Sequence, residues 1–176
     1  MTVVEGEFVR LLEDDGTWQA FQDDWRAQCE PFEEDFDTYA EATFSAVREI
    51  IEKEKKKAGV FALRIEGKHV AMCQINTAAI PRYDAPVMRV RFITLSPEFD
   101  LAEKEIEDYA NVMVELLTQV VILSRTSGEM KTRYIKFHLR SPADRQFFTA
   151  FGKGLHESKY FDNVATQGAW LYISQK

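Results

Sequence analysis

The sequence predicts a single α/β domain spanning residues 1–176, and three observations support this. The chain has 176 residues, of which 45% are hydrophobic, so it can bury one ordinary core. Apolar side chains recur every three to four residues over much of the stretch before Gly59 and every second residue after it. Helix-like and strand-like segments then alternate to the end of the chain. Helices and strands are therefore expected to share one core.

The first third of the chain predicts one strand and two helices. Residues 7–13 (EFVRLLE) form a strand that the DDG sequence at 14–16 ends. Trp18, Phe21 and Trp25 share one face of the first helix. A second helix follows the acidic segment at residues 30–37. Its apolar face consists of Phe36, Tyr39, Phe44, Val47, Ile50 and Ile51.

The middle of the chain predicts three strands. Residues 61–65 alternate in the strand period, and the EGKH turn at 66–69 reverses the chain into a second strand at 70–80. These two strands are expected to pair as a hairpin. A third strand, VMRVRFITL at 87–95, ends at Ser96-Pro97.

The last part of the chain predicts two helices and two or three strands. Residues 104–124 carry a wide apolar stripe and form a helix that is buried on more than one side. Residues 134–139 form the fourth strand. Ser141 caps a short helix at 146–151, and residues 169–173 form the stronger of one or two final strands.

Charge and composition exclude several classes of protein. The net charge is −7, and residues 1–57 hold 16 acidic against 7 basic side chains, so a nucleic-acid backbone is not expected as the main partner. The longest apolar stretch, residues 112–123, is too short to span a membrane, and no signal peptide is recognised, so a cytoplasmic location is expected. Cys29 and Cys73 lie in no metal-ligand pattern, and no metal is expected.

Three segments, in this order, resemble the GNAT superfamily of acyl-CoA N-acyltransferases. FALRIEGKHVAMCQIN resembles the central hairpin of that family. FITLSPEFD resembles its strand ending in a Pro-Glu-aromatic turn, and YIKFHLRSPADRQFFTAFGK resembles its later strand and helix. The resemblance covers most of the chain. It implies a central mixed, mostly antiparallel sheet of about six or seven strands, flanked by about four helices.

The resemblance also implies a cofactor and a reaction. In the family, acetyl-CoA or another acyl-CoA lies between two parallel strands that splay apart, and an amine accepts the acyl group. Carried over to this chain, the cofactor-binding positions are Leu95, Ser96 and Phe99 after the third strand, with Ser141 and Phe148 after the fourth.

The sequence departs from the family pattern in two places. The glycine-rich loop that holds the cofactor's diphosphate is absent, and residues 100–108 hold five acidic side chains and one basic side chain instead. A carboxylate at ~4 Å from a phosphate is repelled by about 1 kcal/mol in water and by up to ~4 kcal/mol at an effective dielectric constant of ~20. Phe148 stands where the family commonly has a proton-donating tyrosine. The resemblance therefore leaves two hypotheses: an N-acyltransferase, or a non-catalytic binding or dimerisation module on the same scaffold.

Several side chains are candidates for the reaction, each with a plainer structural interpretation. Glu98 or His138 could move a proton, and Tyr134, Tyr160 or a water could replace the missing tyrosine, but exposed carboxylates and hydrogen-bonded strand histidines are common. Carboxylates in the acidic segment could attract a small cationic amine, or could simply be solvated. Those carboxylates are Glu33, Glu34 and Asp35. Basic residues around the fourth strand could meet the acidic segment of a second copy, as in a homodimer.

Overall fold

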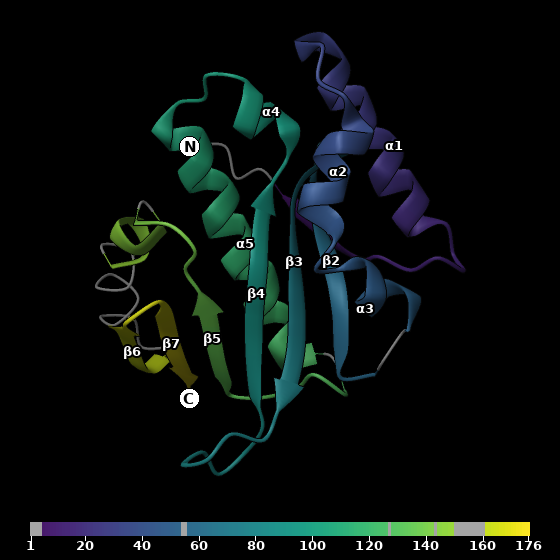
Figure 1. Cartoon of the computed structure of the whole chain (residues 1–176). Coiled ribbons are helices and arrows are strands. Elements are labelled where there is room, and N and C mark those ends of the chain that lie inside the picture. The colour runs from purple at the N-terminus through teal and green to yellow at the C-terminus, as the bar shows by residue number, and fades with distance from the viewer. Residues whose placement is uncertain (1–4, 54–55, 127, 143, 150–160) are drawn as a thin grey trace.

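The computed structural model describes residues 5–53, 56–126, 128–142, 144–149 and 161–176. These residues form a seven-stranded sheet in the order β1-β2-β3-β4-β5-β7-β6 (Figure 1). Among the described strands, β4 and β5 alone run parallel, which confirms the expected mixed, mostly antiparallel sheet. The strands are β1 (Gly6–Arg10), β2 (Ala58–Ile65), β3 (Lys68–Ala78), β4 (Val87–Leu95), β5 (Tyr134–His138), β6 (Phe161–Gln167) and β7 (Trp170–Gln175).

Helices cover the two faces of this sheet unequally. On one face, α1, α2 and α3 lie over β2 and β3, and the long α5 crosses the opposite face (Figure 1). The short α4 follows β4, and residues 144–149, after β5, are also helical. The helices are α1 (Thr17–Cys29), the 3-10 turn η1 (Glu30–Phe32), α2 (Phe36–Phe44), α3 (Arg48–Glu52), α4 (Pro97–Leu101) and α5 (Ile106–Thr126).

The predicted hairpin is confirmed, and its turn explains the pairing of β2 with β3. Glu66 and Gly67 have φ values of 52° and 80°, so both central residues adopt the left-handed conformation of a type I′ turn. This turn matches the right-handed twist of the two strands. The register then shifts between Leu63 and Arg64, where a bulge at Val70 interrupts the pairing.

Two predictions for the helices were wrong. The second predicted helix is divided into α2 and α3, because the chain turns at Val47, whose backbone amide donates to Phe44 O at 3.0 Å. Ser45 and the β-branched Val47 are weak helix formers, and Phe44 and Val47 both remain buried on either side of the break. Helix α4 was not predicted because its five residues are too few to show a period. The first strand is also shorter than predicted and ends at Arg10.

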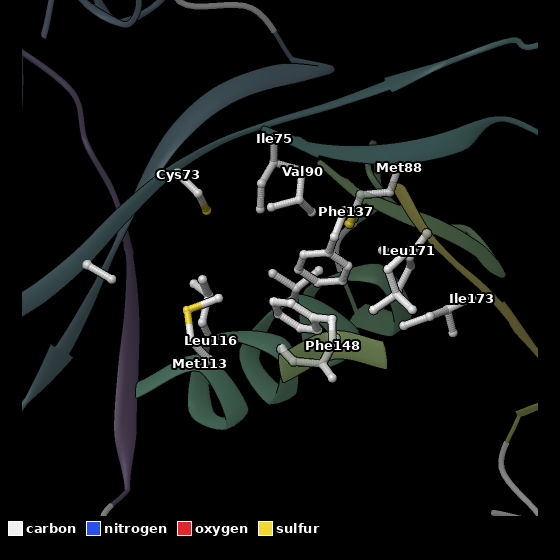
Figure 2. Close-up of a cluster of buried hydrophobic side chains, with 14 of the residues drawn as sticks. Cys73, Ile75, Met88, Val90, Met113, Leu116, Phe137, Phe148, Leu171 and Ile173 are labelled. Atoms are coloured by element: carbon white, nitrogen blue, oxygen red, sulfur yellow. The ribbon is translucent and has the colours of Figure 1, made fainter. Parts of the chain in front are cut away.

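Two apolar clusters hold the layers together. The cluster between the sheet and α5 includes Val90, Leu116, Phe137 and Phe148 (Figure 2). The cluster under α1, α2 and α3 is rich in aromatic rings, with Phe21 and Trp25 at a centroid distance of 4.3 Å and both fully buried. Aromatic side chains of this size remove large apolar areas from water, so both clusters contribute strongly to the stability of the fold.

Candidate active site

The parallel strands β4 and β5 separate partway along their length. Their pairing runs from Val87 opposite Tyr134 to Val90 opposite Phe137. Beyond Val90, β4 continues to Leu95 with β3 as its paired neighbour, and β5 diverges from it (Figure 1). The β5-facing edge of β4 therefore has backbone groups without a ladder partner on β5 beyond Val90.

A β-bulge lies where the two strands separate. Met72 pairs with Thr94 and Gln74 pairs with Arg91, so two residues of β4 stand opposite the single residue Cys73. Within the bulge, Phe92 has a φ of 54°, which is rare for an aromatic side chain. Bulges bend a strand and increase its twist, and this one bends β4 at the point where β5 leaves it.

A cleft of about 850 Å³ opens at this end of the sheet. Its volume falls within the roughly 300–1,000 Å³ of small-molecule sites. Three walls surround it: the end of β4, the α4–α5 connection, and the residues that follow β5. The lining side chains are Ile93, Thr94, Leu95, Phe99, Asp100, Ala102, Glu103, Lys104, Glu105, Tyr109 and Arg140.

The cleft contains both signs of charge. Asp100, Glu103 and Glu105 line it together with Lys104 and Arg140. The ammonium of Lys104 lies 5.4 Å from the centre of the Phe99 ring, a cation–π distance, which keeps this cation beside the apolar part of the wall.

Two of the acidic side chains in this region already serve the fold. The carboxylate of Asp108 accepts a hydrogen bond from the backbone amide of Glu105 at 3.3 Å, so it satisfies one donor at the amino end of α5. Asp100 accepts a hydrogen bond from the Tyr39 hydroxyl at 2.9 Å and thereby joins α4 to α2. Burial, and then the Asp100 carboxylate, raise the pKa of Tyr39, so its hydroxyl remains a donor.

Tyr109 connects two walls of the cleft. Its hydroxyl donates a hydrogen bond to the carboxylate of Asp144, and burial together with this bond raises the pKa of Tyr109. The same carboxylate accepts the backbone amide of Ser141 at 3.1 Å, and the Ser141 hydroxyl accepts the amide of Asp144 at 3.0 Å. This reciprocal capping box confirms the predicted helix start, and the bond from Tyr109 to Asp144 holds α5 against the segment after β5.

The chain is similar to known proteins in structure but not in sequence. No protein-family model and no curated protein matches the chain. A probable acetyltransferase from Staphylococcus epidermidis is similar in structure, with a TM-score of 0.55, 13% identity, and coverage of 97% of this chain and 99% of that one. AtaTR bound with acetyl-CoA gives a TM-score of 0.54 at 11% identity, with 97% and 93% covered. The chain has the GNAT acetyltransferase fold. The Campylobacter jejuni N-acetyltransferase PseH gives a TM-score of 0.50 at 7% identity, with 97% and 99% covered.

The cofactor-binding positions implied by the GNAT resemblance fall into four groups. Leu95 and Phe99 line the cleft. Ser96 is buried beneath it, where its amide donates to Val70 O and its carbonyl accepts from the Phe99 amide. Ser141 caps the helix that follows β5. Phe148 is 1% exposed and stacks in the core with its ring 6.0 Å from that of Phe137, so it does not line the cleft (Figure 2).

The catalytic candidates lie in different parts of the GNAT fold. Glu98 on α4 is held between two ammonium groups, at 3.0 Å from Lys68 and 3.9 Å from Lys104. His138, the last residue of β5, packs its ring 4.8 Å from that of Trp170. Tyr134 begins β5 and stands opposite Val87, about 23 Å along the sheet from Thr94 at 3.3 Å per residue. The structure therefore does not bring Tyr134 to the cleft. Tyr160 lies outside the described residues.

The predicted acceptor-binding carboxylates lie on the connection between α1 and α2, at the same end of the sheet as α4 (Figure 1). Glu33, Glu34 and Asp35 are all exposed, and none of them lines the cleft. The Thr38 hydroxyl donates to the Asp35 carboxylate at 2.7 Å, and this bond lowers the pKa of Asp35.

Two further features concern the described part of the chain. None of its helices is long and apolar enough to cross a bilayer. No group of three or more metal-ligating side chains is gathered among these residues.

Tyr109, Arg140 and the Phe92 bulge were missed by the sequence analysis. Tyr109 belongs to the apolar stripe of residues 104–124, and Arg140 belongs to the basic residues around the fourth strand. Neither pattern distinguishes these two residues from their neighbours. The sequence VMRVRFITL does not by itself reveal the bulge, because a strand buried on both faces would show the same adjacent apolar residues. Only the pairing with β3 shows that two of its residues share one partner.

Proposed function

We propose that the protein is an N-acyltransferase that moves an acyl group from acyl-CoA to the nitrogen of an amine. The observation that carries this proposal is the opening of the parallel β4–β5 pair directly at the cleft. A thioester and an amine that enter from opposite sides of the sheet can meet in such an opening. The GNAT fold of the chain supports the same reaction class, although a fold alone does not determine activity.

The residues of the cleft fit an acyl-CoA. The edge of β4 beyond Val90 offers backbone groups that can pair with the amides of the pantetheine arm. Lys104 and Arg140 can contact the phosphates near the amino end of α5, where orphan amides and the helix dipole favour an anion. Glu103 and Glu105 are exposed, so water screens their repulsion to about 1 kcal/mol each. The acidic stretch therefore weakens cofactor binding without preventing it.

The reaction also requires proton transfer. The bound acyl-CoA would supply a thioester, whose carbonyl carbon forms a bond to the amine nitrogen while its bond to sulfur breaks. A side chain or water must accept a proton from nitrogen, and the leaving thiolate must take up a proton to depart as the coenzyme A thiol. His138 is placed best for this role, because it is the first residue of β5 beyond the segment paired with β4. An imidazole can accept a proton. Glu98 serves less well because two lysines hold its carboxylate.

Cofactor binding can be tested by thermal unfolding with and without acetyl-CoA. A ligand at 100 times its dissociation constant adds about 2.7 kcal/mol of stability, which shifts the midpoint by several degrees. We expect Lys104→Glu and Arg140→Glu each to reduce this shift, because each replaces a cation of the cleft with an anion. Lys56→Glu, an exposed change of the same charge outside the cleft, should leave the shift intact.

Acyl transfer itself can be measured as release of the coenzyme A thiol in the presence of a panel of amines. His138→Gln should lower the turnover number and alter its pH profile, with the acetyl-CoA shift unchanged. A protein that neither gains stability from millimolar acetyl-CoA nor releases thiol with any amine would contradict the proposal. It would then favour the non-catalytic module considered above.

A further inference from the structure

One part of the sheet carries three cations on the face opposite α5. Met88 and Val90 of β4 point into the α5 core, as do Ile135 and Phe137 of β5. Side chains alternate along a strand, so Arg89, Arg91 and Lys136 lie on the other face. We call these three residues the cationic face. In Figure 1, α1, α2 and α3 lie over β2 and β3, beside this part of the sheet rather than over it.

The three cations are close together and lack counter-ions. Arg89 is the register partner of Lys136, and Arg91 follows two residues later on β4, roughly 7 Å away. Burial, and then the charges of Arg89 and Arg91, lower the pKa of Lys136. Among the described residues, no carboxylate forms an ion pair with any of the three. Like charges held side by side without an anion destabilise a sheet.

Buried polar atoms beside these cations also lack partners. Gln74, only 4% exposed, is the register partner of Arg91, and its Oε1 atom accepts no hydrogen bond from the described residues. Asn76 is the register partner of Arg89, and its Oδ1 atom finds no hydrogen-bond partner in the described part of the chain. The same holds for the Nε atoms of both arginines. Buried groups of this kind are rare in folded proteins, and a bound ligand is one way to satisfy them.

Aromatic rings hold the third cation in place. The Lys136 ammonium lies 4.1 Å from the centre of the Trp170 ring and 5.4 Å from that of Tyr172. These cation–π contacts fix the ammonium on the face, so less of its mobility is lost when an anion binds. Positive charge, unpaired hydrogen-bonding atoms and aromatic walls thus occur together on β3, β4, β5 and β7.

We propose that the cationic face binds the anionic group, a carboxylate or a phosphate, of the acceptor amine. This inference rests on the proposed function, because it assigns the face to that acceptor. Arg91 and His138 each follow the last residue of the β4–β5 pairing, so a molecule bound here reaches the opening between the strands. Guanidinium groups match carboxylates and phosphates in geometry. The acceptor is therefore a small amine that also carries a negative charge, in place of the purely cationic amine expected from Glu33, Glu34 and Asp35.

The first experiment measures binding by calorimetry on the full chain without acyl-CoA. Phosphoethanolamine and 4-aminobutyrate serve as the phosphate and carboxylate probes, with ethanolamine and putrescine as uncharged-tail and dicationic comparisons. We expect at least one anionic probe to bind more than about 10-fold tighter than both comparisons, because charge-assisted hydrogen bonds are strong. The anionic probe that binds more tightly shows whether the acceptor amine carries a phosphate or a carboxylate.

Variants then assign the binding to this face. Arg89→Gln and Arg91→Gln should each weaken the anionic probe by about 10-fold to 100-fold. Arg48→Gln, the same loss of charge at an exposed position on α3, should not change it. The thermal midpoints of both site variants should not fall, which separates loss of a ligand contact from loss of folding.

The outcomes separate this inference from the proposed function. If acetyl-CoA stabilises the protein but ethanolamine or putrescine binds and reacts as well as the anionic probes, the inference is overturned and the acyl transfer stands. If acetyl-CoA has no effect but an anionic probe binds and is lost in Arg91→Gln, the acyl transfer is overturned and the anion site stands. Binding unchanged in both arginine variants, or absent for every anionic probe at millimolar concentration, overturns the inference.

Discussion

One face of the sheet has two parts that differ in what covers them. Under α1, α2 and α3, residues Val60, Ala62 and Met72 meet a cluster of aromatic rings and are fully buried. On β4 and β5 the same face carries Arg89, Arg91 and Lys136, which are half-buried and have no ion-pair partner among the described residues.

The aromatic part of this face therefore stabilises the fold, whereas the cationic part is suited to binding a ligand. The aromatic part lowers the free energy of the folded state, because apolar area leaves water and the rings pack closely. The cationic part raises it, because like charges and unpaired polar atoms are brought together. Folded proteins tolerate such local costs mainly where a ligand binds, and this part adjoins the opening between β4 and β5.

The largest expected effect tests the aromatic part. Trp25 is fully buried and its ring nitrogen donates to His69 O at 3.0 Å, so Trp25→Ala should destabilise the fold by about 3–5 kcal/mol. Trp170→Ala, on the cationic part, should cost only about 1 kcal/mol, because its contacts are mainly cation–π and stacking. Urea unfolding measures both, and equal losses would erase the contrast between the two parts.

A second prediction concerns the polar link beneath the aromatic cluster. The carboxylate of Asp24 accepts the backbone amide of His69 at 2.6 Å and lies 2.8 Å from its ring Nδ1. Asp24→Ala should cost about 2 kcal/mol, because the nearly buried His69 loses its acceptor. The exposed neighbour gives the matched control: Asp23→Ala should change unfolding by less than about 0.5 kcal/mol. A similar loss in both variants would show that the link to His69 does not matter.

The smallest effect has the opposite sign. Arg89→Gln removes one member of the like-charged pair with Lys136 and relieves Arg91, so it should stabilise the protein by about 0.2–1 kcal/mol. The gain should shrink at high salt, because ions screen the repulsion in the parent protein. A clear destabilisation in the same urea experiment would show that Arg89 supports the fold and would weaken the contrast.

Periodicity in the sequence predicted most of the elements but not all their ends. The alternation in residues 61–65 and 87–95 and the stripe in residues 104–124 correspond to β2, β4 and α5, because a buried face forces an apolar side chain at each repeat. The division of the second helix and the presence of α4 were missed. Segments of five residues contain too little of a period to be recognised, and tertiary contacts decide whether they form.

The candidate site was predicted only in part. Leu95 and Phe99 line the cleft, and their role in binding a cofactor stays a prediction, whereas Phe148 belongs to the core and Tyr134 lies at the far end of β5. A sequence assigns a residue to a strand face but does not tell how far along the sheet a neighbouring strand begins. The register of β4 against β5 sets that distance.

The sequence by itself determined the order of most strands and of the longer helices, the hairpin turn at Glu66-Gly67, and the capping box of Ser141 with Asp144. These features depend on contacts between residues close along the chain, so local propensity is enough to specify them. Only the tertiary structure decided that β4 bulges at Phe92, that β5 leaves it there, and that Arg89, Arg91 and Lys136 gather beside the opening. The bulge depends on the pairing of β4 with β3, and the other two features depend on the pairing of β4 with β5, which lies more than 40 residues further along the chain. No local pattern records which residues such pairing brings together.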